Sequence, residues 1–386
     1  MVAEGYKETE IGVIPVEWEV VKVGDILNVQ TGKMNAQDQV ENGKYPFFTR
    51  SVDVQTIDTF AYDTEALFIA GEGNFKVKYY NGKFNLHQRT YMLTSIKDAN
   101  MKFLLNAIQP KVNKLISTSV GSTVQSLRKP LIEDLKIPFP PLKEQEKIAD
   151  ILSTADEKID AIEEQIQKAE TLKKGLLQKL LSEGIGHSKF KDSELGKIPE
   201  SWEVVELRDI GKVSMCKRIM KSETTEYGEI PFYKIGTFGK EANSYISQEI
   251  YEDYKEKYSF PKKGDILISA SGTIGRTVVY DGVPAYFQDS NIVWIDNKED
   301  KSLNSFLFYV YITVKWHTDG NTIARLYNEN LRRIKFPLPP LKEQKQIADI
   351  LSTADEKLEV LRAKKQMYET LKIGLLQKLL SGEVRV

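Results

Sequence analysis

The sequence has a single cysteine and only three histidines, which excludes several classes of site. Cys216 cannot form a disulfide within the chain, and it cannot build a cysteine-based zinc cluster. His87, His187 and His317 are scattered and form no ligand pattern. We therefore expect no metal site, and we expect a chain that works in the reducing cytoplasm.

Long apolar runs are also missing. No stretch approaches the ~18 consecutive apolar residues that a membrane span needs, and the N-terminus lacks the charged-then-apolar pattern of a secretory leader. The composition, 41% hydrophobic and 28% charged, is typical of a globular protein with substantial cores. A length of 386 residues favours two or three folded units over one.

The chain lacks an excess of positive charge. It has 54 Lys and Arg residues against 55 Asp and Glu residues, a formal net charge of −1. Strong non-specific affinity for nucleic acid comes from neutralising many phosphates with Lys and Arg. A DNA-binding role therefore requires basic residues concentrated on one face, or a partner that supplies most of the phosphate contacts.

Catalytic motifs are absent as well. The sequence contains no phosphate-binding P-loop, and GEGNFK at 71–76 lacks the third glycine of a dinucleotide fingerprint. The PFPP and PLPP strings differ from the Asn- or Asp-led motif of amino-methyltransferases, and SGT at 271–273 has no matching His–Asp arrangement. We predict that the chain has no catalytic residues of its own.

What the sequence contains instead is an internal repeat. EIGVIPVEWEVVKVGDI starts at Glu10 and returns at Glu194 as ELGKIPESWEVVELRDI. PPLKEQ, IADILSTADEK and TLK-x-GLLQKLL, which begin at 140, 148 and 171, return at 339, 347 and 370. The repeat predicts two globular segments, each followed by a long spacer helix; their expected bounds are 1–136, 137–186, 187–335 and 336–386.

Each predicted helix carries a heptad pattern of apolar residues, which is typical of a coiled coil. Prolines stand just before each helix, where they suit a first turn. About 38 residues at 1.5 Å rise give a helix roughly 57 Å long. We expect the two helices to pack antiparallel on each other. The residues predicted at the helix or partner interface are Ile148, Leu152, Ile159, Ile162, Leu172, Leu176, Ile347, Leu351, Leu358, Leu361, Leu371 and Leu375.

Identity between the two helices is uneven. LKEQ, TADEK and LLQKLLS match at positions expected to be exposed, whereas the central stretches IDAIEEQIQKAE and LEVLRAKKQMYE have diverged. Recent duplication predicts even similarity, so we interpret the helix ends as one surface presented twice, to two copies of one partner. Gly175 and Gly374 occupy equivalent interior positions, where glycine costs about 1 kcal/mol against alanine. Close approach of another backbone or simple inheritance would explain them.

The globular segments are interpreted as mixed α/β. Runs rich in β-branched and aromatic residues, among them 66–71, 89–95, 264–270, 277–280 and 291–295, predict strands between glycine turns. Shorter helices are expected near 100–116 and 302–316. The copies share their edges, such as GSTVQSL at 121–127 and GNTIARL at 320–326, but not their centres. Two domains that recognise different targets would need this pattern, with a shared sequence at their edges and different sequences at their centres.

Polar loops in these centres predict the DNA face, because Arg and Lys suit guanine edges and phosphates while Asn and Gln suit adenine. The candidate contact residues are Arg50, Asn74, Lys76, Lys78, Lys83, Gln88, Arg89, Arg128, Lys217, Arg218, Lys221, Lys234, Thr273, Arg276, Gln288, Asn291 and Arg325.

The doubled LPPLKEQ, IADILSTADEK and TLK-x-GLLQKLLS motifs, with IP and WEVV opening each half, resemble type I restriction–modification specificity subunits over the whole chain. The resemblance implies two target recognition domains joined by an antiparallel coiled coil. It also implies a bipartite double-stranded DNA target and two modification (methyltransferase) subunits that bind S-adenosylmethionine. Restriction subunits that use ATP and magnesium would join them. No cofactor is expected in this chain.

On this interpretation each globular segment reads a different half-site, mainly in the major groove, and the helix pair sets the spacer between them. Methylation of an adenine in each half-site would require flipping the base into a partner's pocket. Two alternatives remain open. A coiled-coil scaffold without DNA function would explain the helices but not two divergent α/β domains, and a fused nuclease or methyltransferase would need a catalytic motif.

Overall fold

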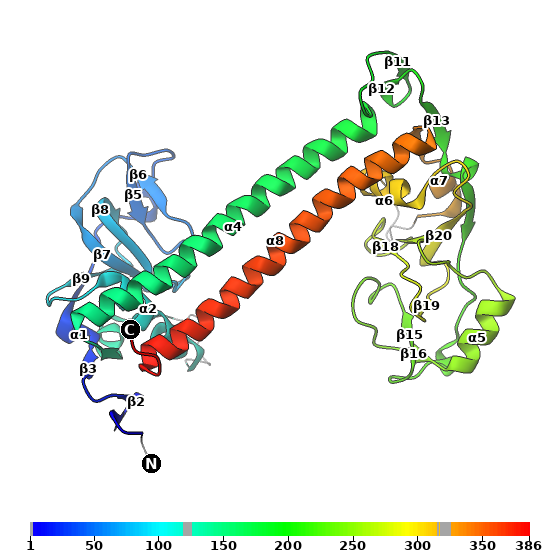
Figure 1. Ribbon diagram of the computed structural model, residues 1–386. Helices are drawn as coiled ribbons and strands as arrows, with labels where there is room; N and C mark the ends of the chain where they lie inside the picture. The colour runs from blue at the N-terminus through cyan, green and yellow to red at the C-terminus, as the bar shows by residue number, and fades with distance from the viewer. Residues whose placement is uncertain (1–2, 119–125, 315, 317–325) are drawn as a thin grey trace. The chain divides into compact units, whose positions relative to one another are not determined.

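The computed structural model describes residues 3–118, 126–314, 316 and 326–386 (Figure 1). The chain divides into two compact units: unit 1 comprises Met1–Glu164 and Arg362–Val386, and unit 2 comprises Gln165–Leu361. This division cuts both long helices near their middles, so each unit contains one globular segment and half of each helix. The four-segment division by repeat stays a prediction. None of the described helices is long and apolar enough to cross a membrane.

Unit 1 is built on a six-stranded sheet with the strand order β4-β9-β7-β8-β5-β6. Its neighbouring strands are antiparallel except β5 and β8, which run parallel with Phe47 opposite Asn85 and Phe48 opposite Leu86. Outside this sheet, β1 pairs with β2 and β3 pairs with β10. The elements up to the first long helix are β1 (Tyr6–Thr9), β2 (Gly12–Pro15), β3 (Glu19–Lys22), α1 (Val23–Ile26), β4 (Leu27–Thr31), η1 (Ala36–Asp38), β5 (Tyr45–Phe48), β6 (Gln55–Ile57), β7 (Tyr62–Ala70), β8 (Lys78–Leu86), β9 (Thr90–Ser95), α2 (Met101–Thr118), α3 (Lys129–Glu133), β10 (Lys136–Phe139) and α4 (Leu142–Ser182).

Unit 2 repeats this succession. A four-stranded sheet, β14-β20-β17-β18, and a three-stranded sheet, β16-β15-β19, replace the single sheet. β15 and β19 again run parallel, with Phe232 opposite Tyr286 and Tyr233 opposite Phe287. One helix, α5, has no counterpart among the described residues of unit 1. The elements are β11 (Phe190–Ser193), β12 (Gly196–Pro199), β13 (Glu203–Glu206), η2 (Leu207–Asp209), β14 (Gly211–Ser214), η3 (Lys221–Glu223), β15 (Ile230–Tyr233), β16 (Tyr245–Ile246), α5 (Gln248–Lys257), β17 (Ile266–Ser269), β18 (Thr277–Val279), β19 (Tyr286–Phe287), β20 (Ile292–Asn297), α6 (Asn304–Thr313), α7 (Asn328–Arg332), β21 (Lys335–Leu338) and α8 (Leu341–Ser381).

The ends of the long helices are part of the globular cores. In unit 1, Ile148 and Leu152 of α4 and Leu379 of α8 are buried in the same cluster as Trp18 and Phe103. In unit 2, Ile347 and Leu351 of α8 are buried with Trp202, Phe306 and Leu307. In each unit, the ends of the long helices are therefore fixed to the globular segment by a continuous apolar core.

The two long helices run antiparallel, as predicted. Within unit 1, Asp156 of α4 is ion-paired with Lys372 of α8, and Glu163 with Lys365. An advance of seven residues along α4 is thus matched by a retreat of seven along α8, which is an antiparallel register. In unit 2, Lys173 and Asp355 form the counterpart of the first pair. The mixed α/β fold with two long antiparallel helices is confirmed.

Two of the residues predicted at the helix or partner interface, Leu172 and Leu371, do not face the other long helix. They are 59% and 51% exposed. The heptad positions one residue further along are Lys173 and Lys372, whose ammonium groups reach Asp355 and Asp156 across the helix pair. A residue one position away on an α-helix points about 100° to the side, so these leucines face away from the contact. The remaining predicted residues are buried or half-buried: Ile148, Leu152, Ile159, Ile162, Leu176, Ile347, Leu351, Leu358, Leu361 and Leu375.

The repeated LKEQ motif has an internal explanation, contrary to our interpretation of it as a partner surface. Glu144 accepts a hydrogen bond of 2.9 Å from the indole of Trp18, and Glu343 accepts the same bond, also 2.9 Å, from Trp202. Gln145 is fully buried, donates to the carbonyl of Pro140 and accepts the backbone N–H of Asn100. Gln344 makes the equivalent contacts with the carbonyl of Pro339 and the N–H of Leu303. Each motif ties the first turn of a long helix to its own globular domain.

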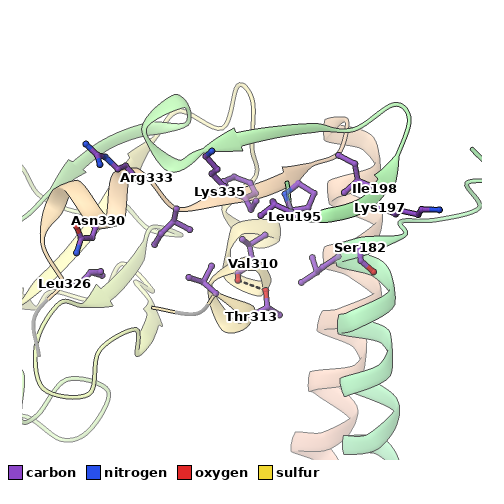
Figure 2. Close-up of a pocket in the computed structure, with 15 residues that line it drawn as sticks. Ser182, Leu195, Lys197, Ile198, Val310, Thr313, Leu326, Asn330, Arg333 and Lys335 are labelled. Carbon is purple, nitrogen blue, oxygen red and sulfur yellow. Dashed lines mark hydrogen bonds between the residues drawn. The ribbon is translucent and has the colours of Figure 1, made fainter. Parts of the chain in front are cut away.

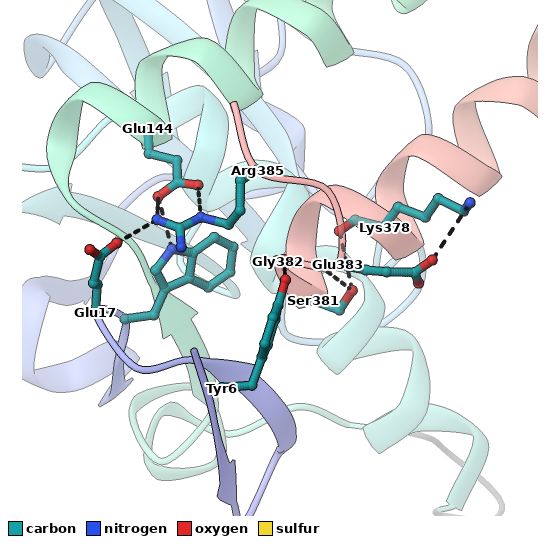
Figure 3. Close-up of polar contacts among 9 residues, drawn as sticks. Tyr6, Glu17, Glu144, Lys378, Ser381, Gly382, Glu383 and Arg385 are labelled. Carbon is teal, nitrogen blue, oxygen red and sulfur yellow. Dashed lines mark hydrogen bonds and ion pairs between the residues drawn. The ribbon is translucent and has the colours of Figure 1, made fainter. Parts of the chain in front are cut away.

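The last residues of the chain complete this arrangement in unit 1 (Figure 3). Arg385 donates to both carboxylate oxygens of Glu144, at 2.7 and 3.1 Å, and to Glu17 at 2.7 Å. In unit 2 the backbone N–H of Ile185 and the ring of His187 contact Glu343 instead, at 2.9 and 2.8 Å. The segment that follows each long helix therefore contacts the glutamate at the start of the other long helix.

Candidate nucleic-acid interface

Two arginines and a carboxylate meet in unit 1 where β5, β7 and β8 end. Glu72 is ion-paired with Arg89 and with Arg50, the latter at 3.4 Å. The Glu72 side chain is 20% exposed, while those of Arg50 and Arg89 are 43% and 61% exposed. The carboxylate thus lies behind the two guanidinium groups, whose remaining N–H donors face solvent. The hydrogen bond from Arg89 lowers the pKa of Glu72, which keeps the carboxylate ionised.

His87 forms a fixed part of this site. It is buried, and its Nδ1 accepts the backbone N–H of Arg89 at 3.0 Å. Burial, reinforced by Arg50 and Arg89, lowers the pKa of the imidazole. The neutral imidazole accepts a backbone hydrogen bond and so orients the Arg89 backbone. It adds no positive charge to the site.

Most of the other predicted contact residues of unit 1 lie around this cluster. The N–H of Asn74 donates to the carbonyl of Arg50, and Lys78 donates to the carbonyl of Ser51 at 2.7 Å. The Gln88 amide donates to Asn35 at 2.8 Å. Lys76 follows two residues after Asn74, and Arg128 precedes α3 beside Leu127, whose N–H donates to Gly71.

Lys83 does not belong to the cluster. Its ammonium group lies 4.8 Å from the centre of the Phe60 ring, and its residue pairs with Asp63 across β7 and β8. The sequence could not distinguish it from Lys78, because both are lysines of the same strand, and only the tertiary fold leaves Lys78 half-buried and Lys83 exposed.

In unit 2 the corresponding site surrounds Asp289. Arg218 donates to this carboxylate at 2.9 Å; its side chain is 67% exposed and that of Asp289 is 16% exposed. An open cavity of about 260 Å³ is lined in part by Arg218, Lys221, Lys234, Gln288 and Asn291, all predicted contact residues. The structure thus brings together most of the candidates that lie in unit 2.

The remaining candidates of unit 2 differ in their accessibility. Lys217 is exposed, with its ammonium 4.9 Å from the centre of the Tyr258 ring. Arg276 is half-buried and donates to the carbonyl of Phe238 at 2.7 Å, so part of its donor capacity is used internally. Thr273 is exposed in the turn between β17 and β18. Arg325 lies outside the described residues.

Sequence reasoning missed both acidic residues, Glu72 and Asp289. Composition favours basic and amide side chains as DNA contacts, so a carboxylate gave no signal by itself. Only the fold shows that each carboxylate contacts an exposed arginine.

A larger cavity in unit 2 is separate from this site (Figure 2). It has a volume of about 850 Å³ and is lined by the end of α4, the β11–β12 hairpin, α6 and the α7–β21 segment. Two of its cations, Lys335 and Arg333, are ion-paired with Glu194 and Glu329. None of its lining residues is a predicted contact residue, so it adds nothing to the candidate interface.

Comparison with known proteins agrees with this architecture. The family model for the type I restriction modification DNA specificity domain matches residues 15–171 and again 199–369. A putative type I restriction enzyme specificity subunit from Haemophilus influenzae is 38% identical over 343 residues, covering 87% of this chain and 86% of that protein. The type I restriction enzyme MjaVIII specificity subunit from Methanocaldococcus jannaschii is 30% identical over 419 residues, covering 99% and 96%.

Among solved structures, the S subunit of the type I restriction–modification system from M. genitalium matches with a TM-score of 0.66. It is 19% identical and covers 94% of this chain and 96% of that one, a likeness that concerns the fold. The family model accounts for both halves of the repeat, and the relatives span nearly the whole chain. This protein belongs to the family of type I restriction–modification specificity subunits.

Proposed function

We propose that each unit reads one half of an asymmetric, bipartite DNA sequence. The observation that supports the proposal is that each unit carries, after its parallel strand pair, a site in which an exposed arginine is ion-paired with a half-buried carboxylate. The side chains around them differ, as two readers of different half-sites require. The near-zero net charge is compatible with this role, because base reading needs well-placed donors more than a general excess of cations.

The long helices are the proposed docking sites for two modification subunits. Most of the repeated motif at the helix ends is used inside the chain, but Leu172 with Gly175 and Leu371 with Gly374 are not. Both leucines are exposed, and a Cβ on either glycine would meet no described atom within 4 Å. Two copies of the same leucine–glycine patch support two docking sites of one kind, since a small residue lets a partner backbone approach closely.

In this assembly the chain determines which DNA sequence is bound, and its partners carry out the catalysis. S-adenosylmethionine would bind the modification subunits, and ATP and magnesium the restriction subunits. Transfer of a methyl group to adenine requires the base to leave the helical stack. The proposed task of this chain is to hold the modification subunits at the correct positions on double-stranded DNA.

The test is methylation mapping in cells that express this chain with its modification subunit. We expect adenine methylation at one bipartite motif, and none when this chain is omitted. A variant that tests the docking sites replaces Leu172 and Leu371 by lysine. It should abolish methylation, while the purified chain still binds its DNA. No methylation by the unmodified pair, with the modification subunit active beside another specificity chain, would overturn the proposal.

A further inference from the structure

The two candidate sites can be aligned residue by residue through their backbone hydrogen bonds. The N–H of His87 donates to Phe48 as that of Gln288 donates to Tyr233, so Gln88 corresponds to Asp289. The N–H of Gly71 donates to Arg89 as that of Ala270 donates to Asn291, so Arg89 corresponds to Asn291 and Glu72 to Ser271. Unit 2 has one more residue between these two points.

Two side-chain contacts recur at equivalent places in this frame. The first, link A, joins the second residue after β8 or β19 to the loop after β4 or β14. In unit 1 it connects Gln88 and Asn35 at 2.8 Å, and in unit 2 it connects Asp289 and Arg218 at 2.9 Å. Asn35 and Arg218 each stand four residues beyond the end of their strand.

The second contact, link B, joins the residue that follows β7 or β17 by two positions to the residue just before β9 or β20. In unit 1 it is the ion pair of Glu72 and Arg89. In unit 2 it is the hydrogen bond of 2.8 Å from the Ser271 hydroxyl to the Asn291 side chain. Link B is therefore charged in unit 1 and neutral in unit 2, while link A is neutral in unit 1 and charged in unit 2.

We propose that links A and B are the specificity-determining positions of both recognition domains, and that their chemistry is exchanged between the two. Arg89 at link B of unit 1 and Arg218 at link A of unit 2 each contact a guanine. The amides at the neutral links, Gln88 with Asn35 and Asn291, contact adenine. This inference rests on the proposed function.

The geometry favours base reading over phosphate binding for both arginines. An arginine that only neutralises phosphate gains from a free positive charge, whereas Arg89 and Arg218 are each paired with a carboxylate. The carboxylate restricts the guanidinium to one orientation and leaves its other N–H groups exposed. A guanidinium held in this way can donate two hydrogen bonds to O6 and N7 of guanine, which is the commonest specific contact in the major groove.

The experiment maps methylation in cells that express the modification subunit with each of four variants. Arg89→Ala should relax one guanine position in one half-site, and Arg218→Ala one guanine position in the other. A bidentate contact of this kind discriminates against the wrong base roughly 5- to 150-fold. Loss of the contact is therefore visible as methylation of sites that the unmodified chain leaves unmethylated. Glu72→Ser combined with Arg89→Asn copies link B of unit 2 into unit 1. At the motif position that Arg89→Ala relaxes, this double variant should change the preferred base from guanine to adenine.

Lys83→Ala is the matched control, since Lys83 is a basic residue of the same domain outside both links. It should leave the motif unchanged. In every variant the untouched half-site reports whether the complex has assembled, because methylation requires both halves. Uniform loss of methylation by Arg89→Ala or Arg218→Ala, relaxation in the same half-site by both, or relaxation at a base other than guanine would overturn the inference. A bipartite motif from the unmodified chain shows that the proposed function holds even then.

Discussion

Arg385 joins the C-terminal segment to Glu144 and Glu17 of unit 1, and replacing it tests how much these contacts stabilise the unit. Arg385→Ala deletes two hydrogen bonds to Glu144 and one to Glu17. The Glu144 side chain, 7% exposed, would keep the Trp18 indole as a donor but lose its cationic partner. A buried carboxylate without its counter-charge is destabilising.

The magnitude follows from exposure. Hydrogen bonds to charged groups contribute about 1.5–3 kcal/mol when buried, but the guanidinium is 40% exposed and solvent screens part of the interaction. We expect Arg385→Ala to lower the free energy of unfolding of unit 1 by about 1–2 kcal/mol. With a urea dependence of about 2 kcal/mol per molar, the unfolding midpoint falls by roughly 0.5–1 M.

The assay is urea unfolding followed by circular dichroism, with hydrogen exchange of residues 376–386 as a local readout. Lys378→Ala is the matched control: its pair with Glu383, at 3.6 Å, is exposed on both sides and lies in the same terminal segment (Figure 3). The control should change the unfolding free energy by less than about 0.5 kcal/mol. A cycle with Glu144→Gln isolates the pair, and we expect a coupling energy of about 1 kcal/mol. Equal effects of Arg385→Ala and Lys378→Ala, or no coupling to Glu144, would refute the reasoning.

Four further predictions follow from other parts of the chain. Four residues inserted into the diverged centre of each long helix add about 6 Å of helix, so the spacer of the methylated motif should lengthen; an unchanged spacer in methylation maps would contradict the role of the helices. Gly175→Ala and Gly374→Ala should each stabilise the isolated chain by about 0.5–1 kcal/mol, as helix propensity dictates, and weaken binding of the modification subunit in a pull-down titration; unaltered binding would leave inheritance as the explanation of the glycines. Cys216 is buried, and burial raises the pKa of its thiol to about 12, so a disulfide reagent at pH 8 should label it only after unfolding in guanidinium; rapid labelling of the native chain would show that the site is open. The pKa of Glu72 is lowered in the folded state by Arg89, so its stabilising effect is present above its ordinary value of 4.5 and is lost as the pH falls through the folded pKa; thermal unfolding should therefore separate Glu72→Gln from the parent at pH 7 and bring the two together in acid.

Much of the architecture follows from local pattern. The internal repeat, the two long helices and the strand stretches of both units are encoded in residues close together in the chain, where the heptad spacing of Ile148 and Leu152 or the apolar run at 66–70 acts directly. Packing of the two helices on each other also followed, because two equivalent amphipathic helices in one chain bury most apolar surface against each other. The candidate contact residues were chosen by the same local reasoning, since donor and acceptor chemistry belongs to the side chain, and they stay a prediction.

The tertiary structure decided which of those residues meet. Leu172 and Lys173 differ by one position, and the choice of which faces α8 depends on the phase of the helix and on the carboxylate of Asp355 across from it. Glu144 appeared to be a surface residue because it is charged, yet Trp18, over a hundred residues earlier, makes it part of the core. Glu72 and Arg89, or Asp289 and Arg218, become partners only through strand pairings between distant segments. Periodicity reports the face of a single element, whereas a contact between elements depends on register and topology, which no local pattern contains.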